Sequence, residues 1–247
     1  HTNCLKKYFV NLNNIYKILP YIDNFIFIDS EEEEYAIKLK YDVMNIEKYK
    51  NYIYKNNDIY LDFGKWIYGL ENTDYDYYDY ILLLNDSIII IEDIKNYFHY
   101  LENNKDKVNL YAYNDSSQLG VYHYQSYFFS ISKNITKKFI DYYYKKKPLI
   151  ENQKTLIENM ELNLINIDSK HDCFIKIGKE WNINKNIYWE NEDLYKRLIN
   201  KNKFHIFKLK KIADFYNNYK YDRQKIISNF DNKFYLNNYN DLKYLED

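Results

Sequence analysis

The chain has 247 residues, 46% of them hydrophobic, which is enough to bury a large core in one domain. Its 35 Lys and Arg residues nearly balance its 36 Asp and Glu residues, and the net charge of −1 excludes a global field that would attract nucleic acid or an anionic membrane. No apolar run approaches the ~20 residues that span a bilayer, and two cysteines are too few for a disulfide framework or a zinc site.

Residue usage is biased toward Tyr, Asn, Lys and Ile, with 32 Tyr but only four Gly and two Pro. This bias is typical of an AT-rich genome, such as that of a large DNA virus, so we interpret most tyrosines as packing or surface residues. The chain opens without a signal-peptide pattern and without methionine. We therefore expect a cytoplasmic piece of a longer protein.

The first part of the chain predicts strands that alternate with helices, which is typical of βα units around a mostly parallel sheet. The second strand closes on Asp29 and Ser30, and the four glutamates after Ser30 make a strong helix start. A later helix begins about Gly64, whereas residues 43–54 fit either a helix or a strand with a loop. We expect strands over residues 5–12, 24–30, 58–61 and 80–85, and helices over residues 15–19, 31–39 and 64–70.

The second part continues with clearer helical spacing, and no repeat or Gly/Ser-rich linker divides it. One strand is followed by a polar cluster at residues 114–117, and the aromatic segment after it reads as extended. We expect strands over residues 108–113, 121–131, 171–177 and 204–209. We expect helices over residues 91–101, 133–147, 152–167 and 190–199, followed by a polar tail from Tyr216.

The run Tyr80-Ile81-Leu82-Leu83-Leu84 does not alternate between apolar and polar residues, so it predicts a strand covered on both faces, as inside a parallel sheet. Asn85, Asp86 and Ser87 follow it directly. Ligands of open α/β sheets bind just beyond the carboxyl ends of the strands. Asp86 is therefore either the N-cap of a following helix or a ligand to a metal or substrate.

Four acidic residues follow strand-like segments in this way, and parallel strands would bring them to one edge of the sheet. They are Asp29, Asp62, Asp86 and Asp115. Each alone is accounted for by a turn or a cap, but the set favours a cation or a sugar nucleotide, because Mg²⁺ and Mn²⁺ prefer oxygen ligands. The chain contains no phosphate-binding or dinucleotide-binding glycine motif.

The segments NNDIYLDFGKWIYGL, YDYILLLNDSIII, HYQSYFFSISKNI and ENMELNLI, in this order, resemble the motif series of the rhamnan-synthesis F-type glycosyltransferases. The resemblance covers about residues 56–208 and includes a late segment in which Lys208 follows the final short strand. It implies a GT-A-like α/β fold, with a Rossmann-type, mostly parallel sheet flanked by helices in a single domain. Residues 1–115 would bind the nucleotide sugar, residues 116–215 would form the acceptor side, and residues 216–247 would be a helical tail.

The resemblance also implies a role for individual residues. The nucleotide sugar would contact Asp29, Ser30, Asp62, Gly64, Lys65, Asn85 and Ser87; the acceptor side would use His123, Gln125 and Ser126. Glu161 would be the general base, or Asp115 if the helix lies too far away. Asn85-Asp86-Ser87 would replace the D-x-D of related transferases, so a divalent Mn²⁺ or Mg²⁺ would depend mainly on Asp86, with His205 as a second candidate ligand.

We therefore expect an inverting, metal-assisted glycosyltransferase that moves a sugar, with rhamnose as one candidate, from a UDP- or dTDP-sugar donor to a glycan acceptor. The alternative is a catalytically inactive glycan- or nucleotide-binding module of the same fold, because only one of the three positions in Asn85-Asp86-Ser87 is a carboxylate.

Overall fold

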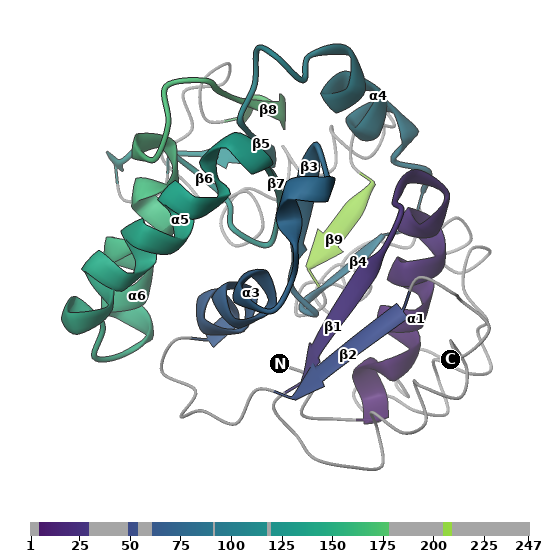
Figure 1. Ribbon diagram of the computed structural model, residues 1–247, viewed down its shortest axis with the longest axis horizontal. Helices are drawn as coiled ribbons and strands as arrows, with labels where there is room; N and C mark the ends of the chain where they lie inside the picture. The colour runs from purple at the N-terminus through teal and green to yellow at the C-terminus, as the bar shows by residue number, and fades with distance from the viewer. Residues whose placement is uncertain are drawn as a thin grey trace, which may run out of the picture.

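The computed structural model describes residues 5–29, 49–53, 61–90, 92–117, 120–177 and 205–208 (Figure 1). The α-helices are α1 (Leu5–Ile18), α3 (Leu61–Glu71), α4 (Lys95–Asn103), α5 (Lys133–Lys146) and α6 (Gln153–Asn159). Short 3-10 helices are η1 (Leu19–Tyr21), η3 (Tyr75–Tyr77), η5 (Lys147–Leu149) and η6 (Glu161–Asn166). None of the helices in these ranges is long and apolar enough to cross a membrane.

The central sheet has five strands: β3 (Tyr80–Leu84), β7 (Phe128–Ser132), β5 (Leu110–Ser116) and β6 (His123–Tyr124) in that order, with β8 (His171–Ile175) also paired to β5. Two smaller sheets accompany it. One is the parallel pair of β1 (Phe25–Asp29) and β2 (Tyr49–Ile53), and the other is the antiparallel pair of β4 (Ile88–Ile90) and β9 (Ile206–Lys208).

The predicted mixed α/β class is confirmed, but the prediction of a mostly parallel sheet is wrong for the central one. Within the described residues, its strand pairs β3·β7, β5·β6 and β5·β7 are antiparallel, and only β5·β8 is parallel. The reason is that the extended segment carrying β6 and β7 returns between β3 and β5. The proposed nucleotide-sugar and acceptor halves therefore share one sheet.

The packing of strand β3 explains why its sequence predicted a parallel sheet. Tyr80, Leu82 and Leu84 pack against the core cluster that includes α4, whereas Ile81 and Leu83 belong to the cluster that includes α3 and α5. Both faces of the strand are covered, as its lack of alternation predicts. Coverage of both faces is common in parallel sheets, but it does not specify the direction of the neighbouring strand.

Strands β3 and β5 nevertheless end at the same edge of the sheet. Both run antiparallel to β7, which lies between them, so they run parallel to each other, and β8 runs parallel to β5. The carboxyl ends of β3, β5 and β8 consequently share one edge. The predicted meeting of Asp86 and Asp115 at a common edge therefore holds at the level of the backbone.

A wide bulge interrupts the pairing at that edge. Ala112 pairs with Phe129 and Asp115 pairs with Tyr124, so two residues of β5 oppose four residues, 125–128, of the other strand. Such bulges bend a strand and redirect its side chains. Here the backbone N–H of Gln125 donates to the backbone carbonyl of Asn114 at 3.1 Å.

The N-terminal prediction of a strand over residues 5–12 is wrong, because this segment and the predicted helix over residues 15–19 form the single helix α1. Its buried residues are Asn11, Asn14, Ile15 and Ile18, which have the i, i+3, i+4, i+7 spacing of one helical face. Two of them are asparagines, so a pattern search restricted to apolar residues does not detect this face.

Asparagines of α1 also complete the edge of β4. The Asn14 side chain donates Nδ2 to the Ile88 carbonyl at 2.9 Å and accepts the Ile90 N–H at 2.8 Å. Asn13 Nδ2 donates to the Ile90 carbonyl at 2.9 Å. These bonds satisfy backbone groups of a fully buried strand.

Most of the remaining elements agree with the sequence prediction except at their ends. However, Leu61, the last residue of the strand predicted over residues 58–61, begins α3, and residues 58–60 lie outside the described residues. The extended segment predicted over residues 121–131 contains two strands, β6 and β7, and β4 was not predicted. Residues 43–54 contain β2, α3 begins at Leu61 rather than near Gly64, and α4 begins at Lys95 rather than at residue 91. The predicted helix over residues 152–167 divides at Met160 into α6 and η6. The helices predicted over residues 31–39 and 190–199 and the tail from residue 216 lie outside the described residues.

Candidate functional site

A groove of about 880 Å³ runs along β3. The whole of β3 forms one wall, and Phe25, Ile26 and Ile28 of β1 contribute to another. Polar and charged groups line it at both ends of β3, with Asp79 and its ion-pair partner Lys105 at the amino end. At the carboxyl end of β3 the lining is charged and polar: Asp62, Lys65, Asn85 and Asp86.

Helix α3 places Asp62 and Lys65 at this end of the groove. Phe63, Trp66 and Leu70 are buried on the core face of the helix, while Asp62 and Lys65 lie in and just after its first turn. Trp66 Nε1 donates to the Leu84 carbonyl at 3.2 Å, which fixes the helix to the end of β3.

Helix α3 approaches β1 closely at Gly69, near the end of the helix. A Cβ at Gly69 would lie 3.1 Å from Cδ1 of Ile28, which is tighter than ordinary contact. Gly64, which was predicted together with Asp62 and Lys65, is also on this helix and is buried. The chain is glycine-poor, and α3 uses two of its four glycines.

Asn85 organises the turn after β3. Its Nδ2 donates to Asp62 Oδ2 at 3.2 Å, and its Oδ1 accepts from the Ser87 hydroxyl at 2.7 Å and the Ser87 N–H at 3.2 Å. Its own N–H donates to the Tyr127 carbonyl at 3.1 Å. Three predicted site residues, Asp62, Asn85 and Ser87, thus form one hydrogen-bonded unit.

Charges around this unit act on the pKa of Asp62 in both directions. Burial raises the pKa of the Asp62 carboxyl, and the negative charge of Asp86 raises it further. The Lys65 ammonium and the hydrogen bond from Asn85 act in the opposite direction on this pKa. Because Lys65 is only 3% exposed, these charges interact at low dielectric, where each is worth more than in water.

Asp86 is not a helix N-cap. The turn at Asp86 and Ser87 leads directly into β4, and α4 begins only at Lys95. Of the two roles that the sequence left open, capping is therefore excluded. Asp86 lines the groove beside Asn85.

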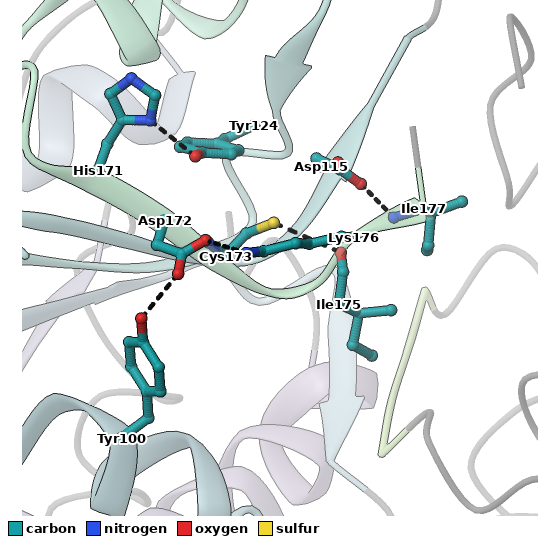
Figure 2. A network of polar contacts seen from close by, with 9 residues as sticks. All are labelled: Tyr100, Asp115, Tyr124, His171, Asp172, Cys173, Ile175, Lys176 and Ile177. Carbon is teal, nitrogen blue, oxygen red and sulfur yellow. Dashed lines mark hydrogen bonds and ion pairs between the residues drawn. The ribbon is translucent and has the colours of Figure 1, made fainter. Parts of the chain in front are cut away.

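The predicted residues at the end of β5 have a different environment. Asp115 is fully buried and His123 and Gln125 are 1% and 3% exposed. The His123 ring accepts from Gln125 Nε2 at 3.2 Å through Nε2, which leaves Nδ1–H to donate to the Val121 carbonyl at 2.8 Å. Asp115 Oδ1 accepts the Ile177 N–H (Figure 2).

Strand β8 adds a polar network beside Asp115 (Figure 2). Asp172 accepts from the Tyr100 hydroxyl at 2.7 Å and pairs with Lys176 at 2.9 Å. Burial raises the pKa of Asp172, but the hydrogen bonds from Lys176 and Tyr100 outweigh it, so the net shift is downward. These contacts fasten β8 to α4.

Cys173 and His171 complete this network without forming a reactive pair. Burial, with the charges of Asp115 and Asp172, raises the pKa of the Cys173 thiol, so it stays protonated and weakly nucleophilic. His171 Nδ1 lies 2.8 Å from the Tyr124 hydroxyl.

Glu161 and His205 lie apart from the end of the groove that contains Asp86. Glu161 is half-buried at the start of η6, which packs against β6. His205 donates its N–H to the Tyr113 hydroxyl at 2.7 Å, and its Nδ1 lies 3.9 Å from Glu92 Oε2. Neither is among the described residues that line the groove.

The remaining predicted residues divide between the described and the undescribed chain. Ser126 is half-buried within the bulge. Asp29 is the last residue of β1, but its side chain and the whole of Ser30 lie outside the described residues. Across the part of the chain that the structure describes, no group of three or more His, Cys, Asp or Glu side chains is arranged to hold a metal ion.

Sequence reasoning missed the residues that hold this site in place. Trp66, Tyr127 and Asn14 link the end of β3 and the start of β4 to the rest of the fold. The only sequence signal for Asn14 is its position in the helical spacing of the buried residues of α1. Comparison with protein-family models and with curated proteins found no match for this chain.

Proposed function

We propose that the chain is a GT-A-like glycosyltransferase that transfers a sugar from a nucleotide-diphosphate donor to a glycan acceptor. The single observation that carries the proposal is the meeting of Asp62, Lys65, Asn85 and Asp86 at one end of the groove, beyond the carboxyl end of β3. UDP- and dTDP-sugars are the proposed donors, and rhamnose is one candidate sugar.

The size and lining of the groove suit such a donor. Small-molecule sites have volumes of about 300–1,000 Å³, with mostly apolar walls and a few convergent polar groups. The groove, at about 880 Å³, has apolar residues of β1 and β3 in its walls and charged residues near both ends of β3. The common direction of β3, β5 and β8, with parallel β1 and β2, is compatible with the proposed fold.

The charged side chains at the carboxyl end of β3 fit a divalent cation that is shared with the donor. Mg²⁺ or Mn²⁺ is commonly held by one or two carboxylates together with substrate phosphates. Asp86 lies close enough to Asp62 to raise its pKa, so a cation here would relieve the repulsion between two carboxylates. Asp86 would be the main ligand, and the cation would supply charge stabilisation of the diphosphate.

The residues of the chain divide the remaining work. As the bond between sugar and phosphate breaks, negative charge develops on the diphosphate, which Lys65 is placed to stabilise. Asn85 keeps Asp62 and the turn in position through its three hydrogen bonds. An inverting reaction also needs a base for the acceptor hydroxyl. Neither predicted base lines the groove: Glu161 lies apart from the end that contains Asp86, and Asp115 is buried and accepts the Ile177 N–H.

The alternative proposal is a binding module without catalytic activity. The lack of a three-ligand metal group among the described residues and the single carboxylate of Asn85-Asp86-Ser87 favour it. In this case the same groove would bind a nucleotide or a glycan without turnover.

Release of UDP or dTDP from a panel of nucleotide sugars, with and without glycan acceptors, tests the proposal. We expect turnover by the wild type and its loss in Asp86→Ala, with unchanged thermal unfolding. The matched control is Asp141→Ala, because Asp141 is exposed on α5 and should leave turnover unchanged. Full activity of Asp86→Ala would contradict the proposal, and nucleotide binding without turnover in the wild type would favour the module.

A further inference from the structure

The end of helix α5 gathers basic and apolar side chains on an outer corner of the molecule. Residues 144–149, here called the basic corner, read Tyr-Lys-Lys-Lys-Pro-Leu and comprise the last turn of α5 and the 3-10 helix η5. Figure 1 shows α5 on the side of the molecule opposite α1. Nothing in the proposed transferase chemistry uses this corner.

The charge of α5 is strongly positive although that of the chain is −1. Residues 133–149 contain six lysines and one aspartate. Along the first half of the helix, acidic partners take up the lysines: Lys133 pairs with Asp79 at 3.6 Å, Lys137 with Asp141 at 2.6 Å and Lys138 with Asp168 at 3.5 Å.

Two of the three lysines of the basic corner contact aromatic rings. Lys146 Nζ lies 5.6 Å from the ring centre of Tyr142. Lys147 Nζ lies 6.0 Å from the ring centre of Tyr143 and 5.5 Å from that of Tyr144. Cation–π contacts of this length hold ammonium groups near the surface and leave their charge in place, and Lys145 is exposed.

Exposed apolar groups lie beside these charges. Leu149 is 54% exposed and Tyr144 is 45% exposed. The Tyr144 hydroxyl donates to Glu71 Oε1 at 2.8 Å, so its ring is held in a fixed position. Lysines in a last helical turn also stabilise the helix dipole, which accounts for the lysines but not for the exposure of Leu149.

We propose that the basic corner docks on an anionic lipid membrane surface. Lysines near such a surface are attracted by its negative potential, and neighbouring aliphatic and aromatic side chains enter the boundary between headgroups and acyl chains. A nucleic acid is a poorer fit, because Leu149 cannot stack on a base. The net charge of the chain is −1, so the membrane attracts the basic corner and not the chain as a whole. This local attraction orients the molecule on the membrane.

Co-sedimentation with vesicles tests this proposal, using phosphatidylcholine alone or mixed with phosphatidylserine. We expect the full chain to bind only the mixed vesicles and to dissociate as salt is added. Replacing Lys145, Lys146 and Lys147 together with glutamine should weaken binding about 100-fold, at about fivefold for each lysine. Leu149→Ser should weaken it severalfold while the salt dependence stays unchanged.

The matched control replaces three exposed lysines on other elements, Lys105, Lys107 and Lys170, with glutamine. It changes the net charge equally and should leave vesicle binding unchanged. Thermal unfolding of each variant confirms that the fold is retained. Equal loss in the control and the basic-corner variant, no binding of the wild type to mixed vesicles, or tighter binding to single-stranded RNA than to the vesicles would each overturn the proposal.

Discussion

Two polar clusters lie at the same edge of the central sheet, and they have opposite environments. The first, after β3, contains Asn85 and Asp86 and lines a groove. The second, at the end of β5, contains Asp115 and His123 and is buried. The strands that carry them are two places apart, or about 10 Å at the usual strand spacing.

The position of each strand in the sheet explains the difference. Strand β5 has β7 and β6 on one side and β8 on the other, so the residues at its end are covered. Strand β3 is terminal in the sheet order among the described strands, and the groove runs along it. An acidic residue after a strand therefore becomes a candidate ligand contact only where the neighbouring strands leave it accessible.

The largest effect should come from breaking the buried cluster. Asp115→Ala would leave the Ile177 N–H without its acceptor in the interior, so we expect the free energy of unfolding to fall by about 3 kcal/mol. Chemical denaturation measures this loss. Nucleotide affinity of the folded fraction should not change.

Asp115→Asn serves as the matched control for this change, because its amide oxygen can still accept the Ile177 N–H. It should recover most of the stability. If Asp115→Asn instead abolished sugar transfer in a fully folded protein, Asp115 would be a catalytic residue and the contrast between the two clusters would fail.

The second largest effect should come from the groove. Lys65→Met keeps the length of the side chain but removes a buried charge, so we expect affinity for a nucleotide diphosphate to fall about 10- to 100-fold, with some loss of stability because the Asp62 carboxyl loses a neighbouring cation. Affinity for the corresponding nucleoside should stay the same. Calorimetric titration with UDP and uridine distinguishes the two, and an equal change for both ligands would argue against contact with phosphate.

Asn85→Ala should have a smaller effect, on the stability of the turn after β3. The variant loses hydrogen bonds to Asp62 and Ser87, which we expect to cost about 1–2 kcal/mol. The control is Asn134→Ala, which removes an exposed asparagine in the first turn of α5 and should change stability by less than about 0.5 kcal/mol. Equal unfolding midpoints for both variants would show that the turn does not depend on Asn85.

The smallest effect concerns the dependence of stability on pH. Because the folded state raises the pKa of Asp62, it holds a proton more tightly than the unfolded state does. The contribution of Asp62 is therefore most favourable at low pH and is lost as pH rises from its ordinary value, near 3.8, through the folded pKa.

Asp62→Asn should remove this loss and stabilise the protein at neutral pH. Thermal unfolding of both proteins between acidic and neutral pH measures it. A variant that is less stable than the wild type at neutral pH would contradict the assigned direction of the pKa shift.

The sequence predicted the positions of helices and strands better than it predicted which strands pair and in which direction. The unbroken apolar run of β3 and the helical spacing of α4 and α5 are local patterns, and the structure has these elements close to the predicted positions. The direction of β7 between β3 and β5 depends on the returning chain, which no local pattern specifies. Helix α1 was not predicted over its full length because two of the four buried side chains among those described in it are asparagines.

The candidate site was predictable in part for the same reason. Asp62, Lys65, Asn85 and Asp86 were selected from motifs, and the structure brings these four together. His123 and Gln125 belong to an equally polar motif, but the bulge between β6 and β7 turns them into the interior. Exposure of a polar side chain depends on contacts made far along the chain, so the motif alone could not distinguish the two groups.

Titration of UDP and dTDP into the wild type and Asp86→Asn, with and without Mn²⁺, tests the central claim most directly. The account predicts that the wild type binds at least one of these nucleotides more tightly with Mn²⁺. It also predicts that Asp86→Asn loses this increase in affinity. With Mn²⁺ present, the variant should bind the nucleotide about tenfold or more weakly than the wild type, because it lacks the carboxylate proposed to hold the metal ion. Equal affinities for the two proteins, or no binding of either nucleotide to the wild type, would contradict it.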